Sequence, residues 1–201
     1  MLLTEFIEDK FKYGRCVLHV DMAYDNILRL FDLFRDDSFN QYDQIDIGLE
    51  MLLHDYDKIE DLALDKKYEL FKFILLEFID IDLDKPQEQS GEKQEKIYDF
   101  DIDADRIYAS FLMDYKIDLM DLQGELHWKK FFALFEGLSS ETPFQKVVGY
   151  RTAKAPKETK HNKEQRNNIK KLKQKYALEQ KEQNADDVFN DMITAFGGTQ
   201  S

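Results

Sequence analysis

The sequence lacks several features that define common protein classes. It has one cysteine, three prolines and eight glycines among 201 residues. A single cysteine cannot build an intrachain disulfide framework, and the shortage of glycine and proline disfavours a turn-rich sandwich or barrel. No apolar run exceeds the five residues from Phe131 to Phe135, whereas a membrane span needs about 20. We therefore expect a helical protein without a membrane segment.

A secretory signal is also missing from the start of the chain. Residues 1–9 are acidic and have neither the basic flank nor the long apolar core of such a signal. We expect the protein to stay in the cytoplasm where it is made. The chain can nevertheless close a core, because 43% of its residues are hydrophobic and 16 are phenylalanine.

Charge is divided unevenly along the chain. The net charge is −13, from 28 basic and 41 acidic side chains. Residues 1–125 carry 32 acids and 14 bases, a balance of −18, whereas residues 146–181 carry 12 bases and 3 acids, a balance of +9. Phosphate contacts supply most nucleic-acid affinity, so the acidic charge of residues 1–125 opposes nucleic-acid binding and leaves that question open only for the basic stretch 146–181.

Periodicity predicts a mainly α fold, a compact helical domain that begins with a short β-hairpin. Phe11 and Tyr13 precede a Gly14-Arg15 turn, after which the chain alternates to Val20 as a second strand would. The clearest helix covers residues 64–78, where apolar side chains recur at steps of four and three. The other predicted helices are 21–35 capped by Asp21, 44–54, 104–115 capped by Asp101 or Asp103, 122–138, and a short one from Thr142-Pro143 to Gly149.

This pattern divides the chain into four parts. Residues 1–81 hold the hairpin and the first helices, and residues 82–96 read as a flexible acidic and polar linker. Residues 97–151 form an aromatic helical segment that we expect to pack with 1–81 as one domain. Residues 152–201 form a helical carboxyl-terminal extension, with a thin apolar stripe over 163–178 and a terminal amphipathic helix that Asn184 or Asp186 would cap.

No residue set indicates a metal site, a cofactor or a catalytic centre. Asp99, Asp101 and Asp103 alternate as an EF-hand loop begins, but Ala104 and Ser110 stand where its glycine and bidentate glutamate belong. We interpret these acids as helix caps and solvated faces. The four histidines are scattered, Cys16 reads as a buried strand residue, and no phosphate loop or nucleophile elbow occurs. We therefore predict that the protein is not an enzyme.

Trp128, Phe131, Phe132 and Phe135 could form an aromatic binding platform. Their spacing is that of a helix burying one face, and core packing is the favoured interpretation.

One resemblance to a known family rests on residues 97–151. The chain reads Tyr98-Asp99-Phe100-Asp101-Ile102-Asp103-Ala104-Asp105-Arg106-Ile107-Tyr108, then Leu126-His127-Trp128-Lys129-Lys130-Phe131, then Leu134-Phe135-Glu136-Gly137-Leu138 and Gly149-Tyr150-Arg151-Thr152. This segment resembles the bacteriophage "gene product fifteen" family of siphophages and prophages. The resemblance implies a gene between those of the tail tube and the tape measure, where long-tailed phages encode tail-assembly chaperones.

The resemblance also implies partners. Such chaperones are small, mainly helical, non-enzymatic proteins that coat the tape-measure protein, bring tail-tube protein to it, and are absent from the mature virion. We expect self-association as well, with the basic arm, residues 152–201 with their basic stretch, attracted to the acidic residues 1–125 of another copy. Candidate partner-binding residues are Trp128, Tyr150 and Arg151 from the family pattern, and Phe189, Met192 and Phe196 from the terminal amphipathic helix.

Two other functions remain open at this point. The protein could be a minor structural component retained in the virion tail. It could also be a regulatory module whose basic arm binds nucleic acid, although the charge of −18 over residues 1–125 opposes this.

Overall fold

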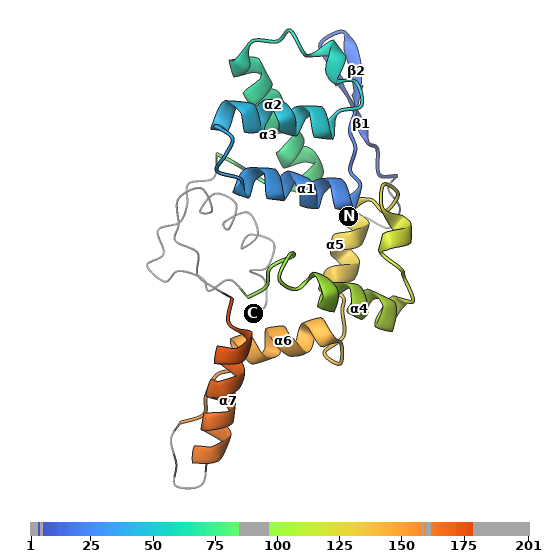
Figure 1. Ribbon diagram of the computed structural model, residues 1–201. Helices are drawn as coiled ribbons and strands as arrows, with labels where there is room; N and C mark the ends of the chain where they lie inside the picture. The colour runs from blue at the N-terminus through green and yellow to red at the C-terminus, as the bar shows by residue number, and fades with distance from the viewer. Residues whose placement is uncertain (1–3, 5, 85–96, 158, 160–161, 179–201) are drawn as a thin grey trace. The chain divides into compact units, whose positions relative to one another are not determined.

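The computed structural model describes residues 4, 6–84, 97–157, 159 and 162–178 (Figure 1). The described residues are mainly helical and include a two-stranded antiparallel hairpin, as the sequence predicts. The elements are β1 (Lys10–Tyr13), β2 (Cys16–His19), α1 (Tyr24–Arg35), α2 (Gln41–Leu52), η1 (Tyr56–Lys58), α3 (Leu64–Ile79), α4 (Ala104–Tyr115), η2 (Met120–Leu122), α5 (Trp128–Glu136), α6 (Pro143–Thr152) and α7 (Lys163–Tyr176). No helix in this described part is long and apolar enough to cross a membrane.

The chain folds as two compact units. The described residues of unit 1 lie within Met1–Glu92 and Leu122–Phe132, and those of unit 2 lie within Lys93–Asp121 and Ala133–Glu182. Residues 122–132 therefore group with the N-terminal elements. The packing of 97–151 with 1–81 as one domain stays a prediction, and residues 85–96 of the predicted linker lie outside the described residues.

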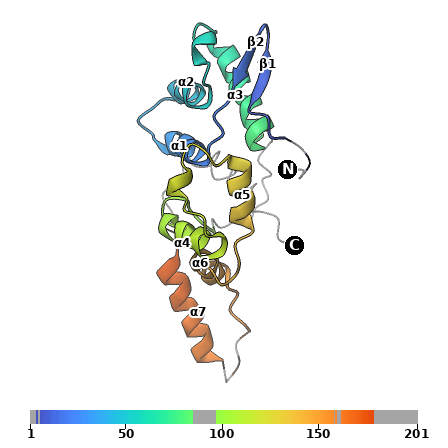
Figure 2. The ribbon, with the colours of Figure 1, turned by 90° about the vertical axis from the view of Figure 1, so that its right-hand side faces the viewer.

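Unit 1 is built from the hairpin and helices α1 to α3. The hairpin register pairs Lys10 with His19 and Tyr13 with Cys16, and Gly14 adopts a φ of 58° in the turn. Figure 2 shows the hairpin beside α3, where the Phe11 and Phe73 ring centroids are 5.0 Å apart. The core is aliphatic and aromatic, with fully buried side chains that include Ile27, Leu30, Leu49, Phe71 and Ile74.

Three details of unit 1 differ from the sequence predictions. Helix α1 begins at Tyr24, and the Asp21 carboxylate accepts the Ala23 N–H at 3.0 Å instead of capping the helix. Helix α2 begins three residues earlier than predicted, because the Asn40 side chain accepts the N–H groups of Tyr42 and Asp43. Cys16 is exposed, contrary to prediction, because it forms the last strand pair before the turn.

Gly48 inside α2 faces closely packed side chains of α1 and α3. A Cβ at this position would lie 3.1 Å from Phe71 Cε2 and 3.2 Å from Leu30 Cδ1, closer than a normal contact. We expect Gly48→Ala to lower the free energy of unfolding by about 1 kcal/mol, because overpacking outweighs the gain in helix propensity. Urea denaturation checks this value.

Gly149 in α6 is the matched control. A Cβ there would meet nothing within 4 Å, so Gly149→Ala should raise the free energy of unfolding by up to about 1 kcal/mol. Equal effects of the two substitutions would contradict the packing role of Gly48.

Unit 2 contains α4, α6 and α7 around an aromatic core. The Phe135 ring lies 5.2 Å from Tyr98, 5.2 Å from Phe100 and 4.9 Å from Phe144, measured between centroids. Burial raises the pKa of the Tyr98 hydroxyl well above its usual range. Helix α6 begins as predicted, because Thr142 Oγ1 accepts the Gln145 N–H and Pro143 occupies the first turn. It does not stop at Gly149 but continues to Thr152.

The predicted helix over 122–138 is too long at its start. Its first part is the turn η2, and the helix proper, α5, begins at Trp128. Gly124 lies between them with a φ of 75°, which a helix cannot contain. The Gly124 N–H instead donates to Asp25 Oδ1 at 2.8 Å, which fastens this loop to α1.

Candidate protein-binding surface

Trp128 is a core residue of unit 1. Its side chain is 2% exposed and packs edge-on against Phe31 at 5.5 Å and in a stack with Phe131 at 5.6 Å. Its backbone N–H donates to Met22 O at 2.7 Å. The core interpretation of the aromatic set is thereby confirmed for Trp128, and this buried side chain offers no contact area to a partner.

Arg151 is also an internal residue, in unit 2. Two of its guanidinium nitrogens donate to the fully buried carboxylate of Asp103, with Nη1 2.5 Å from Oδ2 and Nη2 3.0 Å from Oδ1. Arg106 Nη1 donates to the same Oδ1 at 2.9 Å. A bidentate guanidinium and carboxylate pair of this kind compensates two charges that burial would otherwise penalise.

The alternating aspartates are not solvated faces, so that interpretation is wrong for two of them. Asp99 and Asp103 are 7% and 0% exposed. Asp99 Oδ1 accepts the N–H groups of Asp101 and Ile102, and Asp103 Oδ2 accepts the Asp99 N–H at 3.2 Å. The pattern closes a tight turn before α4 and supplies the carboxylate for Arg151. The side chain of Asp103 does not cap α4.

Tyr150 helps to anchor α7 on α6. Its ring stacks on the ring of Tyr176, the last residue of α7, at 5.4 Å. Arg151 Nε donates to Tyr176 O at 2.6 Å, and the Arg106 guanidinium lies 5.8 Å from the centre of the Tyr176 ring. These contacts explain why α7 forms although its own apolar stripe is thin. Phe189, Met192 and Phe196 lie outside the described residues.

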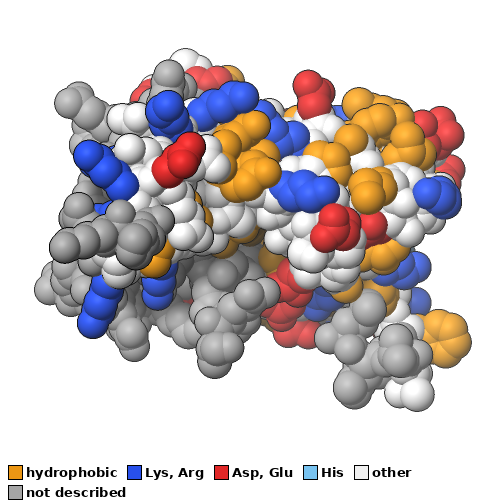
Figure 3. All heavy atoms as spheres, turned by 90° about the horizontal axis from the view of Figure 1, so that it is seen from below, with side chains coloured by type: hydrophobic (Ala, Val, Ile, Leu, Met, Phe, Trp, Pro, Cys, Tyr) orange, Lys and Arg blue, Asp and Glu red, His pale blue; other side chains and the backbone are white. Residues whose placement is uncertain are grey.

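A basic groove in unit 2 lies between residues 153–155, which follow α6, and helix α7. It has a volume of about 480 Å³ and is lined by Ala153, Lys154, Ala155, Lys163, Arg166, Asn167, Ile169, Lys170 and Lys173. We call it the α7 groove. Within the described part of the chain, none of its four lysines forms an ion pair. Lysine and arginine side chains, blue in Figure 3, project from the face of the molecule that this view shows.

A second surface feature lies on α3 in unit 1. Phe73 and Leu76 stand one turn apart and are 43% and 50% exposed. We call this pair the α3 apolar face. Phe73 also packs against Phe11 of β1, so Leu76 is the more exposed of the two.

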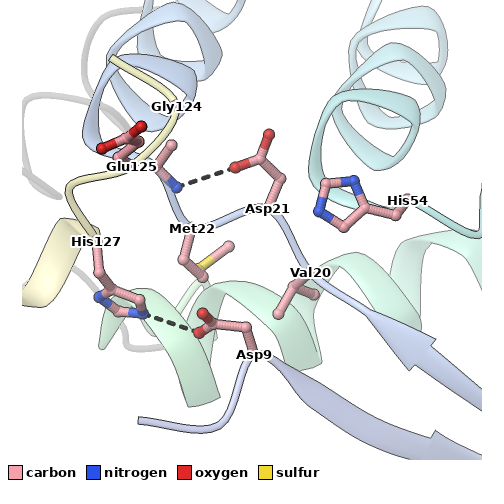
Figure 4. A pocket seen from close by; sticks show the side chains of 9 residues that line it. Asp9, Val20, Asp21, Met22, His54, Gly124, Glu125 and His127 are labelled. Atoms are coloured by element: carbon pink, nitrogen blue, oxygen red, sulfur yellow. Dashed lines mark hydrogen bonds and ion pairs between the residues drawn. The ribbon is translucent and has the colours of Figure 1, made fainter. Parts of the chain in front are cut away.

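A small polar pocket of about 160 Å³ lies in unit 1 where the chain enters the hairpin (Figure 4). His127 Nε2 lies 3.0 Å from Asp9 Oδ1, and His127 Nδ1 accepts the backbone N–H of Lys129 at 3.0 Å. The Nδ1 acceptor role places the ring proton on Nε2, which donates to Asp9. No cluster of three or more His, Cys, Asp or Glu side chains suited to a metal ion occurs among the residues that the structure describes.

Protonation of His127 should destabilise unit 1. Burial lowers the pKa of His127 below 6.5, against the opposing attraction of Asp9, and the charges of Lys129 and Lys130 lower it further. As the pH falls, the unfolded chain therefore protonates His127 before the folded chain does. The stability that unit 1 has with neutral His127 is present above pH 6.5 and is lost at lower pH. Between about pH 7 and pH 5.5, His127→Gln should remove up to about 1.4 kcal/mol per pH unit from the slope of stability against pH. Thermal unfolding across this range measures the slope. An unchanged slope in His127→Gln would contradict the claim that His127 causes this pH dependence.

The fold is that of a mainly helical protein with an N-terminal hairpin and a basic helix after the aromatic core. The profile of the family described as bacteriophage Gp15 protein matches residues 5–178 of the chain. Because the match covers well over half of the chain, the protein belongs to this family. No curated protein and no solved structure matches it.

Proposed function

We propose that this protein is a tail-assembly chaperone, a non-enzymatic phage protein that binds the tape-measure protein and helps to recruit tail-tube subunits. The family match over residues 5–178 carries the proposal. As the resemblance implies, such family members are encoded between the tail-tube and tape-measure genes. The protein would act in the cytoplasm of the bacterial host and leave before the virion is complete.

The surfaces of the described units support this role. A tape-measure protein is a long helical chain, and proteins that hold such chains commonly bind an apolar helix face against their own apolar side chains. The α3 apolar face provides such side chains in Phe73 and Leu76. The basic helix α7, in which no residue is buried, provides a second contact of different chemistry. Two moderate contacts raise the effective concentration yet allow later displacement by tube subunits.

Co-expression with the tape-measure protein tests the proposal. We expect the tape-measure protein to aggregate alone and to be recovered in the soluble fraction together with this protein. Leu76→Ser should reduce that recovery about tenfold, because the loss of one buried leucine contact weakens binding by about 1.4 kcal/mol.

Glu77→Ser is the matched control, because Glu77 is the exposed neighbour of Leu76 on the same helix. Its recovery should equal that of the wild type. A tape-measure protein that stays insoluble in the presence of the wild-type chain would contradict the chaperone function itself, whereas equal losses from both variants would contradict only the α3 contact.

A further inference from the structure

Both walls of the α7 groove are held in place by contacts within unit 2. Near the start of α7, Arg166 Nη1 donates to Pro156 O at 2.6 Å, which ties the connection after α6 to the helix. At the other end of α7, the Tyr150 ring stacks on Tyr176, and Arg151 Nε donates to Tyr176 O at 2.6 Å. Because these contacts already order the groove, a partner that binds there has little ordering entropy to overcome.

The residues that line the groove favour a protein segment with acidic side chains. Its lysines are Lys154, Lys163, Lys170 and Lys173. Within the described part of the chain these lysines form no ion pair, so a partner with carboxylates would relieve the repulsion among them. The apolar lining consists of Ala153, Ala155 and Ile169, and no described lining residue offers an aromatic ring on which a nucleic-acid base could stack.

The spacing of the basic residues favours a helix as the bound segment. Lys163, Arg166, Lys170 and Lys173 follow one another along α7 at steps of three, four and three. Residues at these steps lie on one face of a helix and form a stripe about 15 Å long. A second helix lying along α7 can place acids opposite this stripe at the same steps, as residues that flank the seam of a coiled coil do. A strand repeats every two residues and cannot follow this spacing.

We propose that the α7 groove binds an acidic amphipathic helix of a partner protein. Carboxylates of this helix, spaced three and four residues apart, pair with the groove lysines, and an apolar side chain between them contacts the half-buried Ile169. The proposal rests on the proposed function for the identity of the partner, which is the tape-measure protein. The groove would then select negatively charged helical segments of that protein.

Binding of a synthetic acidic helix to the full chain tests the proposal. The probe is a fluorescent peptide of three heptads, about 21 residues, with leucine on one helix face and glutamate on both sides of it. A scrambled peptide has the same composition without the helical spacing. Fluorescence anisotropy should show at least about tenfold tighter binding of the ordered peptide. Equal affinities, or tighter binding of a single-stranded oligonucleotide, would overturn the assignment of an acidic helix to the groove.

Substitutions in α7 locate the binding site. Lys170→Glu should weaken binding of the acidic helix at least about tenfold, because it replaces an attraction in the groove by a repulsion. Ala155→Glu adds a negative charge at an exposed lining position and should act in the same direction. Lys171→Glu is the matched control, because Lys171 is the adjacent exposed residue of α7 and does not line the groove. Equal losses from the two lysine variants would overturn the proposal.

Co-expression with the tape-measure protein separates this proposal from the proposed function. Lys170→Glu should reduce the recovery of soluble tape-measure protein, and Lys171→Glu should leave it as in the wild type. If the wild-type chain keeps the tape-measure protein soluble but does not bind the acidic helix, the groove assignment is overturned and the chaperone function stands. If it binds the helix at the groove but leaves the tape-measure protein insoluble, the groove assignment is supported and the chaperone function is contradicted.

Discussion

Arg151→Ala should lower the free energy of unfolding of unit 2 by about 3–5 kcal/mol, because it leaves the fully buried Asp103 carboxylate without its bidentate partner. The substitution also removes the donors to Ile97 O and Tyr176 O, which hold the segment before α4 and the end of α7. Native-state hydrogen exchange of amides in α4 and α6 measures this loss locally. Exchange in α7 should rise with it.

Arg106→Gln is the control for Arg151→Ala. Arg106 donates to the same carboxylate, but its side chain is 35% exposed, so its loss should cost no more than about 1 kcal/mol. A double-mutant cycle of Arg151→Ala with Asp103→Ala should give a coupling energy of about 2–3 kcal/mol. Additive effects in the cycle, or equal losses of unfolding free energy for the two arginine variants, would contradict the claim that the Arg151 and Asp103 pair stabilises unit 2.

Trp128→Ala should destabilise unit 1 by about 3–5 kcal/mol. The side chain is almost fully buried between Phe31 and Phe131, and its removal leaves a cavity that these rings cannot fill. Since small domains are stable by about 5–15 kcal/mol in total, the variant should unfold well below the wild-type temperature. Thermal unfolding followed by far-ultraviolet circular dichroism measures the change.

Phe39→Ala serves as the control for the tryptophan. Phe39 belongs to the same unit but is 40% exposed, and its truncation should change stability by less than about 1 kcal/mol. Trp128→Phe separates structure from binding, because it keeps an aromatic ring in the core. At a temperature where this variant is folded, it should bind the tape-measure protein as well as the wild type does. If folded Trp128→Phe lost binding to the tape-measure protein, Trp128 would be a contact residue as the family pattern predicts.

Local patterns predict the elements whose stabilising contacts are close in sequence. The apolar spacing over 64–78 corresponds to α3, which covers Leu64–Ile79, and the Thr142-Pro143 start of α6 is confirmed by the cap itself. The hairpin follows from alternation around Gly14. In each case the side chains that decide the structure lie within one or two turns of one another.

Long-range contacts account for the errors. The aspartates before α4 look like a solvated acidic run because their cation, Arg151, lies 48 residues away from Asp103. The helix expected from residue 122 begins six residues later because Gly124 binds Asp25, 99 residues distant. The partner-binding role of Arg151 comes from the family pattern and stays a prediction, whereas the pairing of its guanidinium with the buried Asp103 carboxylate is a long-range contact that no local pattern indicates.

The most direct test of the proposed chaperone function is the molar mass of the complex formed with the tape-measure protein. It is measured by light scattering after co-expression and copurification. The chaperone function predicts a soluble complex with several copies of this protein on each tape-measure chain. It also predicts that the complex loses these copies when tube subunits are added. Absence of any complex, together with the presence of this protein in purified virions, would contradict the chaperone function. The protein would then be a structural component of the tail.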